Sequence, residues 1–209
     1  MQLQKEELSN GLLIPLDILQ ILIQRAYGQL PFMFQLARCS DEEGLLDTTK
    51  EGKAKLAIKL GLSKTRIQSL IIDAKKFGIL IEHNANELAM NPRFGYIIKN
   101  KEKIENINIK EALFFPFPAL NFFTQVGYGH IIFLLSLCLD SDINGEFPMT
   151  PQTINKLALK MGVSNMRSRT LFMEGKKIKT IIQAENKNWK INPEKLKLYK
   201  CGSIEDDFF

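Results

Sequence analysis

Two short segments carry the excess positive charge of this chain, and clustered positive charge is the chemistry that attracts a polyanion. The segments span residues 53–78 and 154–179, and each holds seven basic residues and one acidic residue, a net charge of +6. The whole chain has a net charge of +5, so the remaining residues sum to 5 − 12 = −7. A solvated helix face is the plain explanation for one such segment. It explains two segments in equivalent positions less well.

The two basic segments are equivalent because the sequence repeats itself. Residues 10–100 match residues 111–201 at a constant offset of 101 and without a gap. Because loops usually accumulate insertions first, an unbroken register indicates an internal duplication. The matched pairs include Pro15/Pro116, Gly61/Gly162, Ser63/Ser164, Arg66/Arg167 and Pro92/Pro193.

Each copy reads as helix, short strand, helix, turn, helix and hairpin. In the first copy we expect a helix over residues 30–39, a strand over residues 45–47, and a helix that follows Thr49 as its N-cap. The buried stripe expected for that second helix consists of Ala54, Ala57, Ile58 and Leu60. The tripeptides at 61–63 and 162–164 have the form of a helix-turn-helix turn, in which glycine permits positive φ, the apolar residue fills the core and serine caps the next helix.

The third helix of each copy presents the polar side chains that are candidates for reading bases. Ile67, Leu70, Ile71, Ala74 and Phe77 have the three-and-four spacing of a buried face. The residues left outward are Lys64, Thr65, Arg66, Gln68 and Ser69 in the first copy, and Asn165, Met166, Arg167, Arg169 and Thr170 in the second.

A hairpin pattern follows each third helix, over residues 78–91 and 179–192. A hairpin behind such a helix is a wing, so we predict an α+β, mainly helical chain of two tandem winged-helix domains. The expected boundaries are 10–100 for the first domain, 101–110 for a linker, 111–200 for the second domain and 201–209 for an acidic, aromatic tail. The alternative fold is an unspecialised helical domain with a small sheet.

The segment from Lys55 to Asn91, with Leu-Ala-x-x-Leu-Gly-Leu-Ser at residues 56–63 and Met-Asn-Pro at 90–92, resembles the winged-helix domain of plasmid replication initiators. The second copy, which ends in Trp-Lys-Ile-Asn-Pro-Glu at residues 189–194, looks more similar still. The resemblance implies double-stranded DNA binding in replication initiation by a plasmid or mobile element. Transcriptional regulation and an accessory role in conjugation or excision stay open as alternatives.

We expect each third helix to enter a major groove and each wing to contact the neighbouring backbone. Arg66 and Arg167 are the expected base readers, because arginine can bond guanine through two hydrogen bonds. Asn86, in the first hairpin, belongs to the expected contact set. The expected phosphate contacts are Lys64, Lys75, Lys76, Lys176, Lys177 and Lys187.

The residues for catalysis or metal binding do not form a matched set. The two histidines, His83 and His130, occupy different places in the repeat, and no Walker loop occurs. We therefore expect no enzyme activity, no metal and no cofactor. Three unmatched cysteines favour a reducing cytoplasm, and no apolar run is long enough to span a membrane.

A protein-interaction module is the alternative from another class. The apolar residues 114–123 can pack the two copies together, cover a sheet edge or form a docking site. The tail at residues 203–209 resembles the C-terminal tip by which bacterial single-strand-binding proteins recruit partners, so it is a candidate protein-docking segment. A solvated or self-packed terminus is the simpler interpretation.

Overall fold

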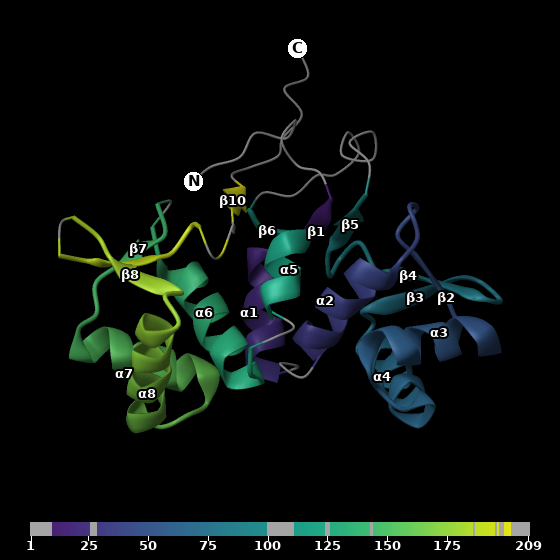
Figure 1. Cartoon of the computed structure of the whole chain (residues 1–209), viewed down its shortest axis with the longest axis horizontal. Helices are drawn as coiled ribbons and strands as arrows, with labels where there is room; N and C mark the ends of the chain where they lie inside the picture. Colours follow the sequence, from purple (N-terminus) through teal and green to yellow (C-terminus); the bar gives the residue numbers. More distant parts are fainter. Residues whose placement is uncertain are drawn as a thin grey trace, which may run out of the picture.

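The computed structural model describes residues 10–25, 29–99, 111–123, 126–142, 144–185, 187–194, 196 and 199–201. Within them the chain forms eight helices and ten strands, and the strands make three antiparallel sheets (Figure 1). This confirms an α+β chain in which helix predominates. The expected linker and the tail beyond Cys201 lie outside the described residues. No described helix is long and apolar enough to cross a membrane.

The two halves of the chain have the same order of elements. The first half contains β1 (Gly11–Pro15), α1 (Leu16–Arg25), α2 (Gln29–Cys39), β2 (Leu45–Asp47), α3 (Lys50–Leu60), α4 (Lys64–Lys76), β3 (Leu80–Asn84), β4 (Glu87–Met90) and β5 (Tyr96–Ile98). The second half contains β6 (Ala112–Pro116), α5 (Phe117–Phe123), α6 (Tyr128–Asp140), β7 (Glu146–Phe147), α7 (Pro151–Met161), α8 (Asn165–Lys177), β8 (Ile181–Gln183), β9 (Trp189–Ile191) and β10 (Tyr199–Cys201). The bounds of β1 and β6, of α3 and α7, and of α4 and α8 differ by 101 residues.

The expected hairpin follows α4 in the first half and α8 in the second. These are the helices that the sequence pattern numbers as the third of each copy, and they are called the third helices below. β3 pairs with β4, and β4 also pairs with the short strand β2, so the first small sheet has the order β2-β4-β3. The second has the equivalent order β7-β9-β8. Each hairpin is therefore tied to the strand that precedes its own helix pair.

A third sheet joins the two halves. Its order is β10-β6-β1-β5, and its central strands β1 and β6 pair over five residues. The apolar residues of this pair are sealed from solvent: Leu12 and Ile14 are 0% exposed, and Leu113 and Phe115 are at most 1% exposed. Such complete burial makes the strand pair part of the hydrophobic core rather than a surface attachment.

The helices that follow the central strands are exchanged between the halves. α1 packs against α6 of the second half, and α5 packs against α2 of the first half. The ring of Phe34 on α2 lies 5.1 Å from that of Phe115 and 5.4 Å from that of Phe123. The expectation that residues 114–123 pack the two copies together is confirmed. Phe114, Phe115 and Phe123 are at most 2% exposed, so these three rings are not available for docking a partner.

One part of the expected buried stripe on α3 is wrong. Leu56 and Ala57 are buried, whereas Ile58 is 83% exposed and the side chains of Ala54 and Leu60 are half-buried. Each residue of a helix turns the side chain by about 100°, so a stripe centred on positions 56 and 57 directs the next side chain away from the core. α7 behaves in the same way, since its equivalent residue Leu159 is 81% exposed.

The close approach of β1 and β6 makes position 11 sensitive to any side chain. A Cβ atom on Gly11 would lie 2.5 Å from the backbone oxygen of Phe115 and 2.5 Å from the ring of Phe114. We expect Gly11→Ala to lower the free energy of unfolding by about 1–3 kcal/mol, as overpacking does. Urea unfolding is followed by circular dichroism and by fluorescence of the single tryptophan, Trp189, which lies in the other half.

Gly129→Ala is the matched control for this substitution. Its added methyl meets only flexible side-chain atoms, the nearest being Nη2 of Arg167 at 3.4 Å. A helical position of this kind tolerates alanine, so the free energy of unfolding should change by less than about 1 kcal/mol. A Trp189 transition unaffected by Gly11→Ala would contradict a core shared by the two halves.

Candidate nucleic-acid interface

The third helix of each half, α4 or α8, begins with the same turn. Gly61 and its equivalent have φ angles of 63° and 65°, in the left-handed region that favours glycine. Oγ of Ser63 accepts a hydrogen bond from the amide of Arg66 at 3.1 Å, and Oγ of Ser164 accepts one from the amide of Arg167 at 3.2 Å. The expected roles of glycine and serine are confirmed. The middle residues Leu62 and Val163 are 39% and 36% exposed, so the expectation that they fill the core is wrong.

The two faces of α4 and α8 are divided as expected, with one exception. Phe77 follows the last turn of α4 and is 49% exposed, although its spacing predicted burial. The core face consists of Ile67, Leu70, Ile71 and Ala74 on α4, and of Ser168, Leu171, Phe172 and Gly175 on α8. The solvent face consists of Lys64, Thr65, Arg66 and Gln68, with Ser69 half-buried, and of Asn165, Met166, Arg167, Arg169 and Thr170.

The two arginines expected to read bases have different surroundings. Arg66 is exposed and makes no side-chain hydrogen bond or ion pair with the residues that the structure describes. Nη1 of Arg167 lies 3.4 Å from Oε1 of Glu174, two turns along the same helix. Arg66 is therefore free to bond a ligand, whereas Arg167 must exchange or share its contact with Glu174.

Equivalent lysines at the end of each third helix hold the following hairpin. Nζ of Lys75 lies 2.6 Å from Oε1 of Glu82 on β3, and this hydrogen bond lowers the pKa of the Glu82 carboxyl. Nζ of Lys176 lies 4.6 Å from the centre of the Trp189 ring on β9, a cation–π contact. Both contacts join the helix to its own hairpin.

The next residues along these helices, Lys76 and Lys177, are exposed and have no partner among the described residues. Lys64, at the opposite end of α4, is also exposed and has no partner among the described residues. These three side chains can therefore meet a phosphate without losing an existing contact. They are the strongest phosphate candidates of the expected set.

The structure places Asn86 and Lys187 in the turns of the two hairpins. The backbone oxygen of Asn86 accepts hydrogen bonds from the amide and the hydroxyl of Thr48, at 2.7 and 2.9 Å, and its side chain is exposed. Lys187 is exposed and has a φ angle of 66°, which is unusual for a residue with a side chain. Exposed polar side chains therefore lie at the turn of each hairpin.

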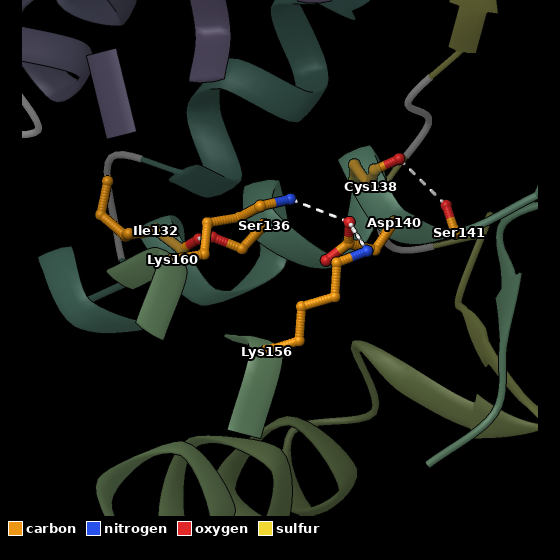
Figure 2. Close-up of polar contacts among 7 residues, drawn as sticks. All are labelled: Ile132, Ser136, Cys138, Asp140, Ser141, Lys156 and Lys160. Atoms are coloured by element: carbon orange, nitrogen blue, oxygen red, sulfur yellow. Dashed lines mark hydrogen bonds and ion pairs between the residues drawn. The ribbon is translucent and has the colours of Figure 1, made fainter. Parts of the chain in front are cut away.

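An acidic residue outside the basic segment of the second half binds two of its lysines, a feature that the sequence analysis missed. Oδ1 of Asp140, at the end of α6, lies 3.0 Å from Nζ of Lys156 and 2.9 Å from Nζ of Lys160 (Figure 2). Both lysines come from α7. The equivalent of Asp140 in the first half is Cys39, so the two halves differ in local charge. No sequence signal links Asp140 to these lysines, because the contact depends on how α6 packs against α7.

His130, on α6, is buried inside the second half. The hydroxyl oxygen of Thr180 lies 3.2 Å from Nε2 of His130 and 3.1 Å from the backbone oxygen of Gly175, so it contacts both groups. Burial lowers the pKa of His130, which keeps the ring neutral near pH 7. Within the described residues, no group of three or more His, Cys, Asp and Glu side chains is placed to hold a metal ion.

The Asp140 cluster leads to a test of stability. The side chain of Lys160 is 11% exposed, and that of Lys156 is 66% exposed. Asp140→Asn leaves the largely buried ammonium of Lys160 without a counter-charge, which should cost about 1–3 kcal/mol. Lys156→Gln removes an exposed partner of the same carboxylate and should cost less than about 1 kcal/mol. Chemical unfolding of the two variants checks this order, and equal losses would contradict it.

Comparison with known proteins gives no relative from which a function can be transferred. No protein-family model, curated protein or solved structure matches this chain. A functional assignment must therefore come from the residues, contacts and charges described above.

Proposed function

We propose that this chain binds double-stranded DNA through two winged-helix units that arose by duplication. The capped turn, the exposed face of the third helix and the hairpin tied to it recur in both halves. A helix fits the major groove of B-DNA, where its side chains reach base edges. The hairpin behind such a helix reaches the neighbouring phosphates.

The observation that carries this proposal is the joint placement of α4 and α8. Both helices project from the lower edge of the molecule in Figure 1, at its right and left ends. Each ends in an exposed lysine without a partner among the described residues, Lys76 or Lys177. Two basic helices on one edge fit one polyanionic rod better than two separate ligands.

The covalent link between the units adds to affinity. Once one unit is bound, the other is held near its site at a high effective concentration, so neither unit needs to bind tightly alone. The initiation of plasmid or mobile-element replication, implied by the resemblance at residues 55–91, is the role that we propose for this binding. Regulation of transcription or DNA transfer would use the same interface.

Salt dependence tests the duplex proposal. If six phosphates are contacted, affinity for duplex DNA should fall by about 10³-fold between 50 and 200 mM salt. Lys76→Ala should weaken binding to all sequences alike and reduce the slope of log affinity against log salt by about 1, because one phosphate contact is lost. Fluorescence anisotropy of a labelled duplex measures both quantities.

The neighbouring ion pair supplies a charge-matched control. Lys75→Ala combined with Glu82→Ala removes one positive and one negative charge that already neutralise each other. Because Glu82 already engages Lys75, we do not count Lys75 among the proposed phosphate contacts, and the salt slope of this double variant should equal that of the unmodified chain. A flat salt response, or no duplex binding at low salt, overturns the proposed function.

Arg66 tests the reading of bases. Arg66→Ala should reduce discrimination between preferred and mismatched duplexes by about 1–3 kcal/mol, which is the contribution of a bidentate contact to guanine. Lys76→Ala is the control, because a phosphate contact does not discriminate. Competition binding with mismatched duplexes measures the difference. Equal loss on every sequence would remove Arg66 from the base-reading role.

A protein-binding function is the second candidate, and one observation favours it. Ile58 and its equivalent Leu159 are 83% and 81% exposed, and Ile72 and its equivalent Met173 are 41% and 58% exposed. Contiguous exposed apolar patches mark interaction sites, and the exposure of the same four positions in equivalent pairs is what favours this candidate. Undetectable duplex binding at low salt would favour this candidate.

A further inference from the structure

The pairing of β1 with β6 relates the two halves symmetrically. Gly11 pairs with Pro116, and Pro15 pairs with Ala112. With the 101-residue offset, Ala112 is the equivalent of Gly11, and Pro116 is the equivalent of Pro15. Each pair is thus the counterpart of the other. A contact in which residue i meets the equivalent of j, while j meets the equivalent of i, is the mark of a two-fold axis.

The backbone hydrogen bonds beside the strand pair show the same relation. The amide of Leu16 donates to the backbone oxygen of Glu111 at 3.1 Å. The amide of Phe117 donates to the backbone oxygen of Asn10 at 3.0 Å. These four residues form two equivalent pairs at the same offset, with donor and acceptor exchanged between the halves.

The centre of the symmetry and the packing of the helices agree with this relation. Leu13 pairs with its own equivalent, Phe114, so the axis passes through this pair. α1 packs against α6, and its equivalent α5 packs against α2, the equivalent of α6. The axis therefore relates the strands and the helices that carry each third helix.

The two halves are held rigidly in this two-fold arrangement, because the contacts between them lie in the hydrophobic core. Leu13 is 0% exposed and Phe114 is 2% exposed, and the rings of Phe34, Phe115 and Phe123 pack across the same boundary. If the two halves were instead related by a translation, the central sheet would have to break and these side chains would be exposed. The burial of these large apolar side chains opposes such a rearrangement.

We propose that the DNA site is an inverted pair of half-sites, an inference that rests on the proposed duplex binding. When two units are related by a two-fold axis, each reads its half-site in the opposite direction along the duplex, as the subunits of a symmetric dimer do. Because α4 and α8 lie on one edge of the molecule, the two half-sites lie on one face of the duplex (Figure 1). Their centres are then about 10–10.5 bp apart, or a multiple of this.

The two half-sites differ in sequence, because the two third helices differ in their exposed side chains. Of the five outward positions on each helix, only Arg66 and Arg167 carry the same residue. Gln68 is equivalent to Arg169, and Thr65 is equivalent to Met166. The site is therefore an imperfect inverted repeat in which a shared guanine contact occurs once in each half.

A selection experiment tests this inference. The full chain selects duplexes at low salt from a library with a randomised central segment. We expect the enriched sequences to contain two related motifs on opposite strands. Selection with Arg66→Ala should erase the preferred guanine in one motif, and selection with Arg167→Ala should erase it in the other. Inserting half a helical turn, about 5 bp, between the motifs should lower affinity by about 100-fold, because the units then face opposite sides of the duplex.

The outcomes separate this inference from the proposed function. If duplex DNA binds and the selected motifs lie in the same orientation, or only one motif is enriched, the inverted arrangement is overturned and duplex binding stands. Binding without any enriched motif also overturns the inference. If no duplex binds at low salt, both proposals fail. A 10-bp insertion is the control for spacing, since it restores the face of the duplex but not the distance.

Discussion

The antiparallel pairing of β1 with β6 joins the two halves of the chain into one fold. It brings together two segments about 100 residues apart and buries their apolar side chains in one core. Strand pairing satisfies the backbone hydrogen-bonding groups that this burial removes from water. The helices that follow the two strands then cross to the opposite half, so neither half can complete its core alone. The position of each third helix is thereby set relative to the other.

Within each half, local contacts set the position of the third helix and its hairpin. A glycine with positive φ and a serine cap set the angle at which α4 and α8 leave the preceding helix. Lys75 and Lys176 then join each helix to its hairpin, one by an ion pair and the other by an aromatic contact. The two halves thus use different chemistry for the same geometric purpose. The two halves also differ at the equivalent arginines, because Arg66 has no side-chain partner among the described residues whereas Arg167 lies beside Glu174.

Much of the fold was predictable because it depends on neighbours along the chain. The turn at Gly61 and Ser63, the two hairpins and the outward faces of the third helices follow from local spacing and capping. Ile58 was misjudged because periodicity shows that a helix has an apolar stripe, but not which part of it another element covers. The ion pairs of Asp140 with Lys156 and Lys160 were missed for a related reason, since they form only when α6 and α7 pack.

The order of the elements, the repeat and the location of the positive charge can all be read from the residues and their spacing. These properties are readable because caps, turns and hairpins involve residues within a few positions of one another. The exchange of helices between the halves and the two-fold axis that relates them become visible only in the folded chain. A tandem repeat is compatible with either a translational or a rotational arrangement. The choice between them depends on strand register between β1 and β6, a long-range contact that composition and spacing do not encode.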